Sequence, residues 1–466
     1  MGSDWSSGLD LLVDLNRAAG LREGIERALR DGMRAGRLPV GSALPSSRSL
    51  ARDLGVARGT VSAAYRQLAA EGYLELRQGA PVRVRWTPRR RPPSAPPPAQ
   101  PAAARWDFRP GQPDRASFPR QAWARACRQV LAGAPDEVFG YGDPRGTPQL
   151  RRALAEYLGR ARGVDTSPEQ LLICSGFTQA LALICQVLRA AGTTLAVEDP
   201  GPHRYRRLAE AAGLAVVPVP CDQDGLEVGH LDRSGARAVL VTPAHQYPLG
   251  ITMSPARRTA LVEWARCRQA LIIEDDYDGE FRYDRQPAGA LQHLDPGHVI
   301  YVGTTSKTLA PAVRLGWLSP PASIGAAITA AKEYADRGTS VLDQLTLAQL
   351  IESGAFDRHV RRMRGSYQRR RDDLAQALAR SHAGLHLAGI SAGLHALARL
   401  PQHGPTEEQI RSRAARRSIA LHTLGRYWHD PPQPAPQAVI IGYATPAGHA
   451  YHPALSALTQ LLTDPR

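Results

Sequence analysis

A proline-rich segment between Trp86 and Arg105 limits what the whole chain can fold into. It reads WTPRRRPPSAPPPAQPAAAR and holds seven prolines without a periodic apolar pattern. Proline lacks a backbone N–H and fixes its own φ, so neither a helix nor a central strand continues through such a segment. We therefore expect an extended linker over residues 86–105 that separates two folded parts, residues 10–85 and 106–466.

The part before the linker shows the pattern of a winged helix-turn-helix. Residues 21–36 place apolar side chains at helical spacing, namely Leu21, Ile25, Leu29 and Met33. PSSRSLARDLGV then predicts a short helix that is capped by Ser46 or Ser47 and broken by Gly55. A second helix follows, and its buried residues are predicted to be Val61, Ala64, Tyr65 and Leu68. Residues 71–85 are predicted to form two short strands, the wing.

Basic residues gather in this first part. The chain has a net charge of +15, and residues 1–105 hold 17 Arg against nine Asp or Glu. The start of the second helix would enter a major groove of double-stranded DNA, where Arg bonds guanine and Thr contacts bases. We expect DNA contacts from four residues, Ser47, Arg48, Arg58 and Thr60. The alternative for any one Arg is a solvated surface charge.

The part after the linker reads as an α/β domain. Apolar strands, LLIC, TLAVED, AVLVTP, LIIEDD and VIYVGT, alternate with amphipathic helical patterns, which is typical of a mainly parallel sheet. No apolar run is long enough to cross a bilayer, and the N-terminus lacks the pattern of a secretory signal. Five scattered cysteines suggest buried thiols in a reducing compartment, so we expect a cytoplasmic protein.

A lysine after the last of these strands carries the main chemical signal. The motif VGTTSKTLAPAVRLGW places Thr304 and Ser306 beside Lys307, and Arg314 follows seven residues later. Pyridoxal phosphate (PLP) needs an amine for a Schiff base, and hydroxyls plus an Arg for its phosphate. Lysine is rare in this Arg-rich chain, so Lys307 is interpreted as required for its primary amine. Lys332, the other lysine, is interpreted as retained by chance.

Two further motifs fit the same cofactor. LIIEDDYDGEF ends a strand in acidic residues, and Asp275 would bond the pyridine nitrogen while Tyr277 would bond O3′. The alternatives are a metal site or a solvated acidic turn. ICSGFTQALALI joins a strand to a helix through Gly176, Phe177 and Thr178, and free N–H groups at a helix N-terminus suit a phosphate.

Both parts resemble known families. PSSRSLARDLGVARGTVSAAYRQLAAEGYLELR is similar to the GntR family of winged-helix regulators, although Pro81 replaces the second glycine of that family's wing. Residues 106–460 resemble fold-type-I aminotransferases. The combination, with FGYGDPRGTPQLR, EDPGPHRYRR, TPAHQYPLG and EDDYDGEFRY, is similar to the MocR family. The resemblance implies that Lys307 carries PLP, and that Tyr141 reaches the phosphate of a partner subunit in a homodimer.

Some positions depart from the aminotransferase pattern. The loop usually written NPTG begins with Tyr247 here, so the resemblance implies that His245 replaces the missing Asn at O3′. Pro202 stands where some members carry an aromatic residue that stacks on the ring. IIGYATPAGHAY has no Arg where aminotransferases bind a substrate carboxylate, which leaves Arg204 and Arg426 as candidates for an effector. The resemblance implies this role more directly for Arg204, and the alternative for Arg426 is an ordinary surface charge.

Three classes of function are compatible with part or all of these motifs. The first hypothesis is a PLP-dependent transcription factor that senses an amino compound or PLP itself. A working aminotransferase that also binds DNA is the second, because both share the first step of amine binding. The third, a DNA-binding protein with an inactive fold, is disfavoured because Lys307, Asp275 and Arg314 are all present. The sequence does not name the effector, the operator or the sign of regulation.

Overall fold

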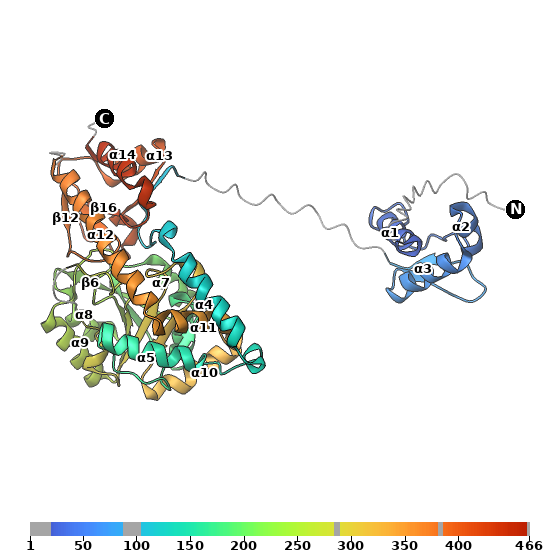
Figure 1. The fold of residues 1–466 in the computed structure, drawn as a ribbon. Coiled ribbons are helices and arrows are strands. Elements are labelled where there is room, and N and C mark those ends of the chain that lie inside the picture. Colours follow the sequence, from blue (N-terminus) through green and yellow to red (C-terminus); the bar gives the residue numbers. More distant parts are fainter. Residues whose placement is uncertain (1–19, 87–103, 284–288, 381–384, 464–466) are drawn as a thin grey trace. The chain divides into compact units, whose positions relative to one another are not determined.

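The computed structural model describes residues 20–86, 104–283, 289–380 and 385–463. The chain divides into two compact units, residues 1–101 and 102–466 (Figure 1). Residues 10–19 of the first expected part and residues 87–103 of the expected linker lie outside the described ranges. Within those ranges no helix is long and apolar enough to cross a bilayer.

The first unit packs three helices against a two-stranded antiparallel wing, as predicted. Its elements are α1 (Leu21–Arg34), α2 (Ser47–Leu54), α3 (Arg58–Ala70), β1 (Leu74–Glu75) and β2 (Arg83–Val84). The hydroxyl of Ser46 caps α2 by accepting from the Ser49 N–H at 3.1 Å. Gly55 ends α2 with a φ of 65°, a left-handed conformation that favours glycine. The predicted burial of Val61, Ala64, Tyr65 and Leu68 is confirmed.

An eight-stranded sheet forms the frame of the second unit, in the order β4-β11-β10-β9-β8-β5-β6-β7. The strands are β4 (Leu172–Cys174), β5 (Leu195–Asp199), β6 (Val216–Asp222), β7 (Gly225–Leu226), β8 (Ala238–Val241), β9 (Leu271–Asp275), β10 (Val299–Thr304) and β11 (Gly316–Ser319). The pairs from β10 through β6 are parallel, and β4, β11 and β7 are antiparallel to their neighbours. This confirms the predicted α/β class.

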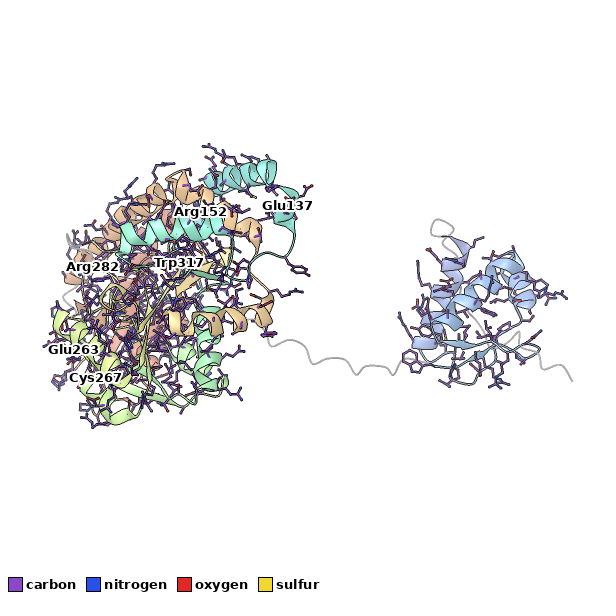
Figure 2. The ribbon with its side chains drawn as sticks, turned by 90° about the horizontal axis from the view of Figure 1, so that it is seen from below. Glu137, Arg152, Glu263, Cys267, Arg282 and Trp317 are labelled. Carbon is purple, nitrogen blue, oxygen red and sulfur yellow. The ribbon has the colours of Figure 1, made fainter. Side chains whose placement is uncertain are left out.

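Helices cover both faces of this sheet because its central strands are buried on both sides. Leu195 and Val197 of β5 pack among residues of α6 (Phe177–Ala190) and α10 (Ala322–Asp336), whereas Ala196 between them packs among α8 (Val228–Ser234) and α9 (Pro255–Arg268). Trp317 lies inside the unit, while Glu263 and Cys267 of α9 lie on its surface (Figure 2). The expectation that the thiols are buried is therefore wrong for Cys267, whose helix position faces solvent.

The remaining helices pack around the large sheet or connect it to a smaller one. Four of them pack with the large sheet, namely α4 (Arg120–Gly133), α5 (Pro148–Arg162), α7 (His203–Ala211) and α11 (Val341–Glu352). Figure 1 shows α12 (Ala355–Arg380) running from them to the small sheet. That sheet has the antiparallel order β12-β13-β16-β15, with β12 (His386–Ala388), β13 (Ala396–Arg399), β15 (His422–Thr423) and β16 (Ala438–Ile441). α13 (Glu407–Arg416) and α14 (Tyr451–Thr463) pack against the small sheet, and β3 (Trp106–Asp107) with β14 (Ile419–Ala420) forms a separate two-stranded parallel sheet.

Candidate cofactor site and DNA-binding face

The carboxyl ends of β9 and β10 bring Asp275 and Lys307 to one edge of the large sheet. Asp275 is the last residue of β9 and lies opposite Val302 in the parallel register, and Lys307 follows the end of β10 by three residues. The Lys307 Nζ donates to the Gly111 carbonyl oxygen at 2.5 Å. Ligands of open α/β sheets bind at this edge, so the geometry places an amine and a carboxylate where a cofactor fits.

Asp275 is unusual because it is buried and its only nearby neutral donor among the described residues, the Tyr205 hydroxyl, does not reach hydrogen-bonding geometry. Only 2% of its surface is exposed, and neither of its carboxylate oxygens meets a described residue in hydrogen-bonding geometry. Burial raises the pKa of Asp275 well above its ordinary value, and the Lys307 amine and the nearby Tyr205 hydroxyl only partly oppose that rise. Burial likewise lowers the pKa of Lys307. A buried, unpaired carboxylate is costly, and a pyridinium N–H is a donor that would satisfy it.

A cradle for a phosphate lies at the N-terminus of α6. Gly176 caps this helix with a φ of 89°, and a Cβ added there would lie 3.6 Å from Arg314 Nη1 and 3.8 Å from Thr304 Oγ1. Thr304 Oγ1 donates to Ser306 Oγ at 2.9 Å. The first N–H groups of a helix have no partner inside the helix, so Phe177 and Thr178 offer donors to the same space. These groups suit a phosphate.

The Phe177 side chain is not available to a phosphate. Its ring packs against Tyr205 with 4.5 Å between ring centroids, and only 7% of the residue is exposed. Of the groups of Phe177, only the backbone N–H therefore remains a candidate for binding the phosphate.

Tyr277 and His245, the residues expected at O3′, share one buried cluster. The Tyr277 hydroxyl donates to the His245 carbonyl oxygen at 2.9 Å and lies 3.1 Å from His245 Nδ1. His245 Nδ1 also lies 2.9 Å from Asp278 Oδ2. The structure adds His395, whose ring centroid is 5.0 Å from that of His245. The sequence patterns indicated neither Asp278 nor His395, although Asp278 stands in the same acidic motif as Asp275.

Tyr141 lies away from this cluster. It is 85% exposed, and the Arg337 guanidinium lies 4.4 Å from the centre of its ring. Both residues line a cavity of about 560 Å³ that is formed by residues 137–143, 146–149, 336–342, 344 and 345, and none of the other proposed cofactor residues lines it. Within its own chain, Tyr141 is therefore not part of the cofactor site.

Arg204 and Arg426 occupy exposed positions. Arg204 is in the first turn of α7, and Arg426 belongs to a 3-10 helix, Leu424–Tyr427. Arg426 Nη2 lies 3.5 Å from Nε2 of His203, which begins α7. Burial lowers the pKa of His203, and the positive charges of Arg426 and Arg207 lower it further. Neither Arg204 nor Arg426 forms an ion pair with a described residue. This region has a positive potential that would favour an anionic group.

The DNA-binding candidates lie together in the first unit. Ser47 and Arg48 begin α2, Arg58 begins α3, and Thr60 follows in the first turn of α3. Arg58 Nε donates to Ser47 Oγ at 3.5 Å, so the two helix starts are neighbours. Arg48 and Arg58 are exposed, and neither forms an ion pair with a described residue. Two unpaired guanidinium groups at adjacent helix N-termini suit phosphates or base edges.

Comparisons with known proteins match both units of the chain. Residues 108–421 match the aminotransferase class I and II family, and residues 21–84 match the gntR family of bacterial regulatory proteins. The HTH-type transcriptional regulator YdeL of Bacillus subtilis is 36% identical over 94% of this chain and 96% of its own. The probable rhizopine catabolism regulatory protein MocR of Rhizobium meliloti is 34% identical over 93% of this chain and 92% of its own. The pyridoxine biosynthesis regulator PdxR of Corynebacterium glutamicum is 33% identical over 88% of each.

Solved structures show the same fold for the second unit. An archaeal alanine:glyoxylate aminotransferase aligns with a TM-score of 0.70 and 25% identity, over 77% of this chain and 91% of its own. A kynurenine aminotransferase of Pyrococcus horikoshii aligns with a TM-score of 0.69. PLP is the cofactor implied by this domain, and the unpaired Asp275, the Lys307 amine and the cradle at Gly176 fit it. The chain therefore belongs to the MocR-type family of HTH transcriptional regulators, which join a GntR DNA-binding domain to an aminotransferase class I and II domain.

Proposed function

We propose that this regulator senses a small amine or amino acid, or PLP itself, with its aminotransferase-like domain and changes its DNA binding in response. The observation that supports this most is Lys307 beside the unpaired Asp275, in a chain whose other unit is a winged helix. Bound PLP supplies an aldehyde carbon that exchanges between the amine of a lysine and the amine of a ligand. A sensor and an aminotransferase need this same exchange.

Each group has a role in this proposal. Lys307 holds the cofactor covalently, Asp275 keeps a proton on the ring nitrogen, and Tyr277 with His245 holds the O3′ side. The phosphate is held by Gly176, Phe177, Thr178, Thr304, Ser306 and Arg314. A ligand amine that replaced the Lys307 amine on the cofactor would free the Lys307 Nζ. The protein without ligand and the protein with ligand would then differ in the contacts of Lys307. That difference can bias two arrangements of the protein and so couple to DNA binding.

The positive region near His203 favours an effector with a carboxylate. Arg426→Ala is expected to weaken binding of an amino acid about tenfold, the loss of one charge-assisted hydrogen bond, and to leave its decarboxylated amine unaffected. Cofactor absorbance titrated with each ligand measures both affinities. Arg152→Ala, which removes an exposed guanidinium from α5, is the control and should change neither. Equal weakening of both ligands would show that Arg426 does not bind the carboxylate.

The test of sensing is a panel of amines, amino acids and free PLP. Each compound is scored for a change in cofactor absorbance and, in parallel, for a change in affinity for the promoter DNA of the regulator's own gene and its neighbours. A compound that changes both supports the proposal. Absorbance changes that never alter DNA binding would contradict it.

Transamination is the second candidate, because the chain carries a lysine amine, a buried carboxylate and phosphate-binding candidates that a PLP enzyme also needs. The segment Ile440–Ala444 carries no Arg, and the Tyr443 hydroxyl there donates to the Ala392 carbonyl oxygen at 2.9 Å. This favours sensing over turnover. Release of a keto acid at a steady rate from any active compound of the panel would favour the enzyme instead.

We also propose a homodimer in which Tyr141 completes the site of the second subunit. Tyr141 and Phe139, which line the same cavity, are 85% and 58% exposed. Exposed aromatic side chains in one region are typical of an interaction surface. A second copy of the chain is the proposed partner, since aminotransferase-type sites lie between subunits.

Mixing two variants tests the shared site. A Lys307→Ala chain and a Tyr141→Phe chain are each expected to bind PLP weakly, whereas their heterodimer should regain one native site, because its Lys307 and Tyr141 then come from different chains. PLP affinity of the mixture after verified subunit exchange is the measurement. No recovery would show that Tyr141 does not serve the partner's site. Mixing Tyr141→Phe with itself is the control.

A further inference from the structure

Lys332, the second of the chain's two lysines, is completely buried in α10, with 0% of its surface exposed. Its Nζ donates to Asp336 Oδ1 at 2.5 Å and to Thr339 Oγ1 at 3.0 Å. Removing an ammonium group from water costs several kcal/mol, so it persists only where its partners are well placed. The chain uses Arg almost everywhere else for charge. A compact amine is therefore specifically suited to this position.

The partner of Lys332 is connected to the phosphate cradle. The other carboxylate oxygen of Asp336 accepts from Gln179 Nε2 at 2.6 Å. Gln179 Oε1 in turn accepts from the Ser175 N–H at 2.7 Å. Ser175 directly precedes Gly176, the N-cap of α6. An unbroken set of hydrogen bonds thus runs from the buried amine to the turn that begins the cradle.

We propose that Lys332 is a positioning residue for the cofactor's phosphate group. It fixes Asp336 and Gln179, and through them it fixes the Ser175–Gly176 turn that aims the first N–H groups of α6. The inference rests on the proposed placement of the phosphate at α6. The hydrogen bonds of the Lys332 amine go to Asp336 and Thr339 rather than to the cradle itself, so its effect is indirect.

Without the Lys332 amine, the hydrogen bonds that join Asp336, Gln179 and Ser175 are expected to weaken. The Asp336 side chain is 29% exposed, so its carboxylate can turn toward water once Lys332 no longer holds it. Gln179 then loses its acceptor and constrains the Ser175 N–H less firmly. Because hydrogen bonds depend steeply on distance and angle, a small shift of the turn weakens the contacts to a phosphate while leaving the pyridine ring site at Asp275 intact.

The same segment extends to the cavity of Tyr141. Asp336 and Thr339 line this cavity, and Arg337 between them adopts a φ of 59° and lies over the Tyr141 ring. Thr339 Oγ1 also contacts the Ile173 carbonyl oxygen of β4 at 3.5 Å. Lys332 therefore joins the cradle to the wall where Tyr141 lies.

The test compares two ligands that differ only in the phosphate. Dissociation constants for PLP and for pyridoxal are measured by absorbance titration of the full-length protein. Lys332→Met is expected to raise the constant for PLP about tenfold, the equivalent of one hydrogen bond, and to leave pyridoxal within about twofold. Gln179→Leu, at a half-buried position, should show the same selective loss. Arg314→Ala is the positive control for a direct phosphate contact.

The outcomes separate two failures. If Arg314→Ala is selective for PLP but neither Lys332→Met nor Gln179→Leu is, the inference about Lys332 is overturned while the phosphate placement stands. If Arg314→Ala weakens PLP and pyridoxal equally, the placement itself is wrong. Equal weakening of both ligands by Lys332→Met would assign it a general structural role and overturn the inference. If Lys332→Met does not fold, Gln179→Leu alone decides.

Discussion

The Lys307→Ala protein is expected to lose its covalent cofactor completely. Lys307 is the amine at the carboxyl edge of the sheet where Asp275 lies buried without a hydrogen-bond partner among the described residues. Alanine has no side-chain nitrogen, so it cannot form the Schiff base that attaches the cofactor. The measurements are the visible absorbance of the purified protein and mass spectrometry of peptides after borohydride reduction, which fixes the cofactor to the amine that carries it.

Lys332→Met is the comparison variant, because it removes the amine of the only other lysine and leaves Lys307 in place. The Lys332 amine is fully buried and paired with Asp336, so it is not free to carry a cofactor. The reduced adduct should therefore map to Lys307 in this variant as in the native protein. An adduct at Lys332, or a borohydride-reduced protein adduct that persists in Lys307→Ala, would refute the assignment.

The features that can be predicted from the sequence are mostly local ones. β9 and β10 are each marked by an apolar run that ends in polar residues, and in a parallel sheet such ends meet at one edge. That rule alone predicts that Asp275 and Lys307 lie close together. The helix-turn-helix is equally local, since Ser46 and Gly55 cap and end one short helix.

What the sequence does not predict depends on contacts between distant residues. The carbonyl that receives the Lys307 amine belongs to Gly111, 196 residues away. Gln179 and Asp336 are 157 residues apart, so no local pattern reveals a role for Lys332. The interpretation that Lys332 is retained by chance is wrong, because its amine is buried and bonded. His395 could not be predicted as a neighbour of His245 either, because the two residues are far apart in the sequence and no local pattern connects them.

Arg58→Ala is expected to weaken binding to the specific operator by roughly 1–3 kcal/mol, about 5-fold to 150-fold, with far less effect on random DNA. Arg58 is exposed at the first turn of α3, and its guanidinium makes a long hydrogen bond of 3.5 Å to Ser47 Oγ. Such a weak contact leaves the guanidinium available for a bidentate bond to guanine. Fold stability should hardly change, because Arg58 forms no ion pair with a described residue.

A comparison on two DNAs isolates the base contact from the charge. Affinity is measured for operator and for random duplex at several salt concentrations, with Arg66→Ala as the control, an exposed Arg about two turns further along α3. A phosphate contact would weaken both duplexes equally and lower the salt dependence by about one counterion. A base contact lowers the ratio between operator and random DNA instead. Equal weakening by Arg58→Ala would therefore show that sequence is recognised elsewhere on α3 or on the wing.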